Sequence, residues 1–484
     1  MYYLNMLLSQ SFMHLHKLGN SRQSKMEALD RTPNVSTTFE VNFTRKYTVK
    51  AINNPLNNQD YVLPLSNLDL LSGRFPVSYF YFYRNSLLPN DFEPIIDTLK
   101  TSLSVILSYY YPFAGRIVQN PKTNEPEIIC DNTGALVVEA NANVPLKELN
   151  FYNLDKTLGG KLVSINHPVF PMQVQVTHFT CGGISITFTF DHALGDASSF
   201  GKLLGSWSQI AQNKPISCIP DHGRIKLCAR FPPSYHPSLD QQFTKCTMEE
   251  IMNIPTPKIL IKRLYFIDES SINWLQSLAC KDGKRRTKIE AFSAYIWKIM
   301  VRAIGENHER CKMGWLVDGR GRMYKDDDKN SMSNYIGNVL SLAFCEAAIE
   351  DLKQGSVSDI ANKVHEAISK VANNDHFLDL IDWVECHRPG LMLSKVVLGR
   401  GGPALVLSSS RRFPVAELDF GFGSPVLGTV CSTVEKIGVA YLNQRPSATG
   451  NGSWTVSAML WPELASALEA DSIFQPMTAS HLQL

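Results

Sequence analysis

The sequence predicts a mixed α/β protein with two lobes, and three observations lead to this expectation. The chain has 484 residues, of which 44% are hydrophobic and 19% are charged. A chain of this length is too long for one ordinary hydrophobic core, so two domains are expected. Patterns of period two, typical of strands, and patterns with three- and four-residue steps, typical of helices, occur in both halves. A proline-rich stretch without periodicity separates the halves. Each lobe is therefore expected to be a mixed β-sheet with flanking helices.

The domain plan follows from these patterns. Polar residues interrupt the apolar ones near the N-terminus, so this region does not read as a signal peptide or a membrane span. We expect a disordered extension over residues 1–35, a first lobe over 36–212, a crossover loop over 213–242 and a second lobe over 243–484.

The first half contains one clear helix signal and one clear hairpin signal. Pro94 suits the first turn of a helix. Two alternating runs flank Cys181, Gly182 and Gly183 within residues 172–192, which predicts a β-hairpin. The helix is indicated by apolar residues at three- and four-residue steps: Ile95, Ile96, Leu99, Leu103, Ile106 and Leu107.

The second half contains comparable signals. Residues 287–304 have helical spacing, and residues 314–323 read as a strand that runs into a loop. Residues 453–471 read as a strand followed by a helix that Pro462 opens.

The stretch "ITFTFDHALGDASSF", residues 186–200, changes from strand to helix pattern at His192. Period-two geometry places His192 at the strand end, on the buried face, and Asp196 fits the N-cap of a helix that begins near Ala197. Two interpretations remain open from this segment. His192 is a hydrogen-bonded core residue and Asp196 only a cap, or His192 is a general base that deprotonates a hydroxyl or amine.

Composition excludes several classes of function. A net charge of +2, without a dense basic stripe, argues against a nucleic-acid partner. Ten scattered cysteines without a CxxC pair indicate reduced thiols in a cytoplasmic protein, and they give no metal-binding pattern. We expect no metal and no membrane span.

A second motif, "DFGFG", occupies residues 419–423. A kinase would need a glycine-rich loop, a strand lysine and an HRD loop before it, and the sequence has none of them. An HxxxD motif followed by DFGxG resembles the plant BAHD acyltransferases, which move acyl groups from coenzyme A thioesters to alcohols or amines. The similarity covers about residues 36–475, in the family's order, through "LSNLDLL", "YYYPFAGRI", "TCGGISITFTFDH", "ARFPPSYHP", "TKIEAFSAYIWK", "VDGRGRM", "NYIGNV" and "GSWTVSAMLWPEL".

The resemblance implies two lobes of the chloramphenicol-acetyltransferase type that face each other across a channel. His192 matches the family's general base, which takes the acceptor's proton during attack on the thioester, without an acyl-enzyme. Asp196 matches the aspartate that pairs with an arginine, for which Arg320 is the best match. The DFGFG residues Asp419, Gly421 and Gly423 match a structural support near the coenzyme channel.

The resemblance also points to substrate-binding residues. Thr287 and Lys288, with Arg286 before them, lie where relatives hold the pantetheine and phosphates of coenzyme A, although a basic turn is as often merely solvated. Arg412 lines up with an arginine that grips an acceptor carboxylate in some relatives. Acyl-CoA is then a co-substrate, and no permanently bound cofactor is expected.

Three residues depart from the hydroxycinnamoyl transferases and bear on the acceptor. Ala197 stands where many of them have glycine, and Ser410 and Phe422 each stand where they have tryptophan. The sequence looks more like the subgroup of coniferyl alcohol acyltransferases, which implies an aromatic or aliphatic alcohol as acceptor, with an aromatic, coniferyl-type alcohol preferred, and a small acyl donor. We also expect a monomer. The alternatives are a hydroxycinnamoyl-CoA transferase with another alcohol or amine acceptor, and a noncatalytic BAHD-like partner of a lipid-elongating complex.

Overall fold

The computed structural model describes most of the chain after residue 38. The predicted extension over 1–35 lies outside the described residues, as do Ser410 and Arg412. Both large sheets belong to one unit, Glu40–Leu484. The described ranges are 39–53, 61–84, 92–163, 169–254, 260–305, 308–323, 331–399, 402–409, 413–432 and 439–484.

The first large sheet mixes strands from both halves of the sequence. Within the described residues its order is β1 (Val41–Val49), β6 (Ala135–Ala142), β7 (Met172–Phe179), β8 (Ile184–Asp191), β3 (Pro76–Tyr83) and β15 (Leu427–Ser432). The pair β6 and β7 is parallel, and the other neighbours are antiparallel. Because β15 follows residue 243, the first sheet is not confined to the predicted first lobe. Pairing between strands so distant leaves no local signal.

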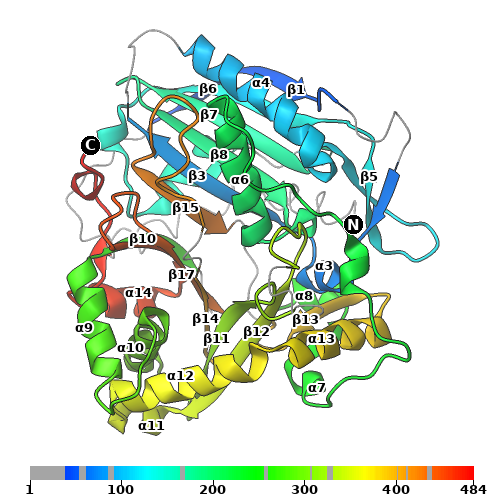
Figure 1. The fold of residues 1–484 in the computed structure, drawn as a ribbon. Coiled ribbons are helices and arrows are strands. Elements are labelled where there is room, and N and C mark those ends of the chain that lie inside the picture. Colours follow the sequence, from blue (N-terminus) through cyan, green and yellow to red (C-terminus); the bar gives the residue numbers. More distant parts are fainter. Residues whose placement is uncertain are drawn as a thin grey trace. The chain divides into compact units, whose positions relative to one another are not determined.

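Two helices cover one face of this sheet (Figure 1). These are α4 (Glu93–Tyr109), which has proline in its first turn, and α6 (Ala197–Ala211). The hairpin of β7 and β8 is present as predicted, and Gly182 in its turn has φ of 80°. Its position in the left-handed region explains why glycine suits this turn.

The second large sheet lies below the first in Figure 1. In the described residues its order is β12 (Leu340–Ala348), β11 (Arg310–Asp318), β14 (Ala404–Ser409), β16 (Ala440–Pro446), β17 (Trp454–Leu460), β10 (Ile261–Ile267) and β18 (Gln475–Pro476). Its apolar face packs against α9 (Glu269–Ala279), α10 (Lys288–Ala303), α12 (Val357–Val371) and α14 (Pro462–Glu469). The helix and strand signals read from the second half therefore correspond to α10, β11, β17 and α14.

Smaller elements fill the space around the sheets. Among the described residues, three short strands pair as β2 (Tyr61–Pro64), β5 (Pro126–Cys130) and β4 (Arg116–Gln119), and two as β13 (Leu391–Ser394) and β9 (Phe243–Cys246). The remaining α-helices are α3 (Asn67–Ser72), α5 (Leu154–Thr157), α7 (Leu239–Gln242), α8 (Met248–Met252), α11 (Ile349–Gln354) and α13 (Asn374–His387). In the described part of the chain, no helix combines the length and apolar character needed to cross a bilayer.

Candidate active site

The strand β8 ends one residue before His192, so the predicted placement of His192 on the strand's buried face is wrong. A short 3-10 helix begins at His192, because the carboxylate of Asp191 caps it. That carboxylate is also 2.7 Å from the guanidinium of Arg74. The backbone N–H of His192 donates to the carbonyl oxygen of Phe75 at 2.9 Å. His192 therefore lies on a tight turn at the end of an internal strand of the first sheet, and its side chain is partly exposed.

The imidazole of His192 is held by stacking and shielded at one nitrogen. It stacks on Phe75 with 4.6 Å between ring centroids and 22° between the ring planes. Its Nδ1 is buried and makes no hydrogen bond to a described residue. Burial lowers the pKa of His192 below 6.5, and the nearby carboxylates of Asp196, Asp191 and Asp69 offset this only in part. A neutral imidazole at neutral pH is the form that a general base requires.

Asp196 is the N-cap of α6 and also one half of a buried ion pair. Its Oδ1 accepts the N–H of Ser199 at 3.0 Å, and its Oδ2 accepts the N–H of Val339 at 3.0 Å. The same Oδ2 accepts a hydrogen bond from Nη1 of Arg320 at 2.7 Å, and the two side chains are 1% and 5% exposed. Burial opposes ionisation of Asp196, but the charge and hydrogen bond of Arg320 hold its pKa below the ordinary value.

The other donors of Arg320 fasten α6 to a segment from the second half of the chain. Its Nη2 donates to the Ser199 hydroxyl at 2.9 Å and to the Gly337 carbonyl at 2.7 Å, and its Nε donates to the Tyr335 carbonyl at 3.2 Å. The cap and the ion pair are thus present together, and they join His192's turn to residues 335–339.

Sequence reasoning missed three residues next to this pair. Asp69 and Arg224 form a second buried ion pair, with 2.9 Å between Oδ2 and Nε. Asn338 connects this pair to the histidine, because its Nδ2 lies 2.9 Å from both Asp69 Oδ1 and His192 O. Asp69 also completes a capping box with Ser66. That local role accounts for Asp69 by itself, so its distant partner could not be found from spacing.

The DFGFG loop is organised by its aspartate. Asp419 Oδ1 accepts the backbone N–H groups of Gly421 at 2.8 Å and Gly423 at 2.9 Å. Both glycines have positive φ, 98° and 103°, which other residues adopt only with strain. The Asp419 carbonyl accepts the Ser208 hydroxyl at 2.9 Å, so the loop is attached to the C-terminal part of α6.

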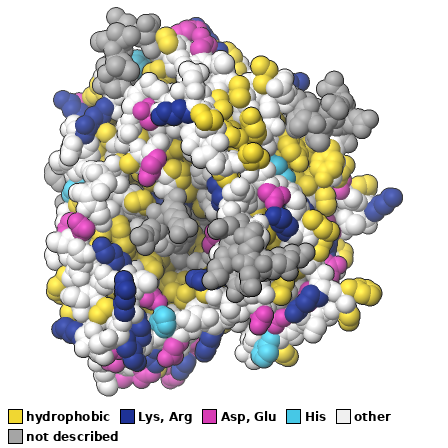
Figure 2. Space-filling view, viewed as in Figure 1, with side chains coloured by type: hydrophobic (Ala, Val, Ile, Leu, Met, Phe, Trp, Pro, Cys, Tyr) yellow, Lys and Arg dark blue, Asp and Glu magenta, His cyan; other side chains and the backbone are white. Residues whose placement is uncertain are grey.

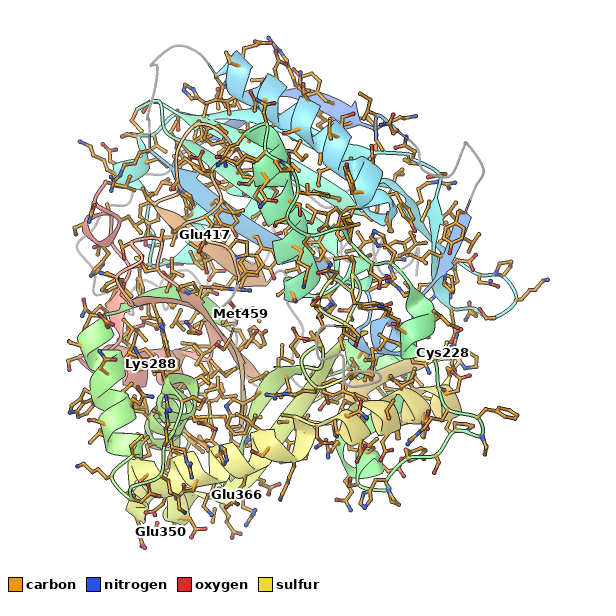
Figure 3. The ribbon with its side chains drawn as sticks, viewed as in Figure 1. Cys228, Lys288, Glu350, Glu366, Glu417 and Met459 are labelled. Atoms are coloured by element: carbon orange, nitrogen blue, oxygen red, sulfur yellow. The ribbon has the colours of Figure 1, made fainter. Side chains whose placement is uncertain are left out.

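The predicted coenzyme-binding residues lie at the start of α10. Thr287 caps this helix through a capping box with Glu290. Lys288 is partly exposed and is labelled in Figure 3. Arg286, however, is only 8% exposed and its Nη2 donates to the Asn362 amide oxygen. In this conformation Arg286 is not free to meet a phosphate, whereas Thr287 and Lys288 are accessible.

A hollow lies near the centre of one face of the molecule (Figure 2). Figure 3, viewed from the same side, places the labelled Met459 of β17 near that centre. Comparison of the two views with Figure 1 shows that the hollow falls between the first and second sheets.

Comparisons with known proteins agree with this architecture. The chain is 30% identical to "Anthranilate N-benzoyltransferase protein 1" of Dianthus caryophyllus over 84% of this chain and 86% of the relative. It is 27% identical to "Shikimate O-hydroxycinnamoyltransferase" of Nicotiana tabacum over 82% of this chain and 92% of the relative. The fold matches that of F. graminearum TRI101 "complexed with Coenzyme A and T-2 mycotoxin" at 15% identity, with a TM-score of 0.68, 86% of this chain covered and 99% of the other.

The fold likeness confirms the predicted fold class, two lobes of the chloramphenicol-acetyltransferase type. The profile of the Transferase family matches residues 39–474, nearly the whole of the described chain. The chain therefore belongs to the Transferase family, as one of its BAHD-type acyltransferases.

Proposed function

We propose that the protein transfers an acyl group from a coenzyme A thioester to the hydroxyl of a small plant metabolite, with His192 as general base. The observation that carries this proposal is the state of the imidazole. Stacking on Phe75 fixes its plane, and burial lowers its pKa and shields Nδ1. Nε2 is then the nitrogen left to take a proton from the acceptor.

The reaction proceeds by direct attack. The acceptor oxygen bonds to the thioester carbonyl carbon as its proton passes to Nε2 of His192. The tetrahedral intermediate collapses with cleavage of the carbon–sulfur bond, and the imidazolium returns the proton to the departing thiolate. Asp196 and Arg320 hold the turn that carries His192 and do not exchange protons in this scheme.

Coenzyme A binding is assigned to the start of α10. Thr287 and Lys288 are accessible there, and a helix N-terminus favours negatively charged phosphate groups. Arg286 has a structural role in this proposal, because its side chain hydrogen-bonds to Asn362 and holds the turn before α10.

The favoured acceptor is an aromatic, coniferyl-type alcohol. This assignment rests on the three residues that depart from the hydroxycinnamoyl transferases, and the position of Phe422 in the structure bears on one of them. Phe422 is 9% exposed and packs on Tyr83, with 5.1 Å between ring centroids. Phenylalanine in place of tryptophan therefore affects the packing of the loop more directly than contact with the acceptor. An amine acceptor is the second candidate, because the relative from Dianthus caryophyllus is named an N-benzoyltransferase.

A panel of donors and acceptors tests the function. Acetyl-, benzoyl- and hydroxycinnamoyl-CoA are each combined with coniferyl alcohol, an aliphatic alcohol, shikimate and anthranilate, and thiol release and product mass are measured. We expect the ester of coniferyl alcohol to form fastest. Preference for anthranilate would show that the acceptor is an amine and not an alcohol. Absence of product from every pair of donor and acceptor would contradict the proposed activity.

Direct attack also predicts that no acyl-enzyme accumulates. Intact-mass measurement of protein incubated with donor alone should show no adduct. Cys181, an exposed thiol in the turn of the hairpin, lies at the opposite end of β8 from His192, roughly 25 Å away at about 3.3 Å per residue. A kinetically competent adduct on any residue would overturn the direct mechanism.

A further inference from the structure

A cleft lies where the crossover loop meets β2 and the chain that follows α4. Its volume is about 640 Å³, a size typical of small-molecule sites. Tyr61 of β2 and Tyr111 after α4 line it, as do Ile219 and Pro220 of the crossover loop. His192 is not among its lining residues, so the cleft is distinct from the candidate active site.

The apolar part of the cleft combines aromatic rings with an exposed aliphatic side chain. Tyr61 is 43% exposed and Ile219 is 70% exposed. The ring of Tyr111 lies 4.8 Å from the ring of His222, whose Nε2 donates to the Tyr109 carbonyl oxygen at 3.0 Å. Tyr111 is thus held from behind, and both tyrosines offer aromatic surface on which a ligand ring can stack.

The charges in the cleft balance each other. Among the described residues that line it, only Asp221 and Lys226 are charged at neutral pH, and Oδ2 of the first lies 2.5 Å from Nζ of the second. Burial lowers the pKa of His222 to about 4 and raises the pKa of Tyr111 to about 12, so both stay neutral. A cleft without net charge favours a neutral ligand over an ion.

Hydrogen-bonding groups remain for a ligand in this cleft. An ammonium group has three hydrogens, and Lys226 directs two of them to Asp221 and to the Ser331 carbonyl oxygen, which is 2.9 Å away. The third hydrogen is left for an oxygen of the ligand. The Asp221 side chain is 33% exposed and can accept a hydrogen bond from a ligand hydroxyl.

We propose that this cleft is a second binding site and that its ligand is a small neutral phenol. The ring of the phenol stacks on the tyrosines, and its oxygens meet Lys226 and Asp221. The site adjoins the segment that Arg320 holds, because the backbone of Asp221 donates to the Asn334 carbonyl at 3.0 Å and accepts from the Ile336 N–H at 2.8 Å. Binding here requires no acyl transfer.

The test is a titration of protein labelled with 3-fluorotyrosine, followed by ¹⁹F NMR, with 2-methoxyphenol as the probe. The signals of Tyr61, Tyr109 and Tyr111 are assigned by replacing each with phenylalanine. Tyr109 is the matched control, because it is 42% exposed, nearly the same as Tyr61, but does not line the cleft. The titration is repeated with His192→Ala, with Lys226→Met, and on the wild type with benzoate and with cyclohexanol.

We expect saturable shifts of the Tyr61 and Tyr111 signals, an unmoved Tyr109 signal, and the same midpoint in His192→Ala. Lys226→Met should weaken binding about 2- to 10-fold, the usual range for one hydrogen bond. Cyclohexanol has no aromatic ring and should bind weaker than 2-methoxyphenol by about the same factor. Benzoate should also bind more weakly, because the cleft has no net charge to offset its anion.

Unmoved Tyr61 and Tyr111 signals would overturn the proposal, as would an equal movement of the Tyr109 signal. Tighter binding of benzoate or of cyclohexanol would show that the assigned ligand class is wrong. The titration needs no turnover, so it decides this proposal even if the wild type transfers no acyl group, and the two proposals can fail separately.

Discussion

The two ends of α6 are held in different ways. At the N-terminal end, Asp196 forms a buried ion pair with Arg320 and accepts two backbone N–H groups. At the C-terminal end, Trp207 packs edge-on against Phe420 of the DFGFG loop at 5.2 Å, and Ser208 donates to the Asp419 carbonyl. One end is held by charge and the other by aromatic packing and neutral hydrogen bonds.

This difference matches what each end carries. The hydrogen bonds of an ion pair fix the orientation of both side chains. The N-terminal end of α6, where the ion pair lies, is the end next to the turn that carries His192. Aromatic packing stabilises without fixing any group for chemistry. We infer that the HxxxD motif positions a reacting group, whereas DFGFG holds the helix in place from its other end. Substitutions at three places test this contrast.

The largest effect is expected at His192 itself. His192→Ala should lower kcat about 100-fold or more, the usual contribution of a general base, and leave thermal stability and coenzyme A binding nearly unchanged. His178→Ala is a matched control, because His178 is another part-buried histidine of this sheet whose ring contacts a phenylalanine, Phe92, at 5.1 Å. Turnover near wild type in His192→Ala would remove the residue from catalysis.

The next effect is expected at the ion pair. Asp196→Asn keeps a good N-cap but removes the buried anion of Arg320 and leaves that guanidinium only the more exposed carboxylate of Asp318. Breaking a buried pair by removing one partner costs about 3 to 5 kcal/mol of unfolding free energy. In a double-mutant cycle with Arg320→Gln, stability and kcat should be strongly non-additive. Asp318→Asn is the control, since Asp318 is 44% exposed and contacts the same arginine at 3.2 Å. A nearly silent Asp196→Asn with additive effects would leave Asp196 as a cap alone.

A smaller effect is expected in the DFGFG loop. Gly421→Ala places a side chain at φ of 98° without steric conflict, because its Cβ would meet only the Ala211 carbonyl oxygen, at 3.8 Å. The backbone strain should cost about 1 to 2 kcal/mol of unfolding free energy, with kcat per folded molecule unchanged. Gly205→Ala inside α6, where a Cβ would meet nothing within 4 Å, should instead stabilise by about 1 kcal/mol. A large loss of kcat in Gly421→Ala would show that the loop takes part in chemistry.

Sequence patterns predicted those features of the fold that are determined by residues close together in the chain. The cap at Asp196, the start of α6 at Ala197 and the hairpin of β7 and β8 all follow from local spacing, and the structure contains them. The end of β8 was missed by one residue, because the side chain of Asp191 caps a turn that alternation does not reveal.

Long-range partners were beyond that reasoning. The pairing of β15 with β3 joins residues more than 340 positions apart, and Arg224 lies in a crossover that reads as structureless. The capping box of Asp69 hides its second role, since one local function explains the residue completely. The pair of Asp196 with Arg320 was anticipated only through the family resemblance.

The central claim, that a neutral and shielded His192 is the base, is tested most directly by the pH dependence of kcat/KM. The unprotonated imidazole must take the proton, so activity should fall as pH decreases through the pKa of His192. Burial lowers that pKa, which places the midpoint below 6.5. We predict a single acidic limb with a midpoint below 6.5 that is absent from the residual activity of His192→Ala. A midpoint at or above 6.5, or the same limb in the variant, would contradict the account.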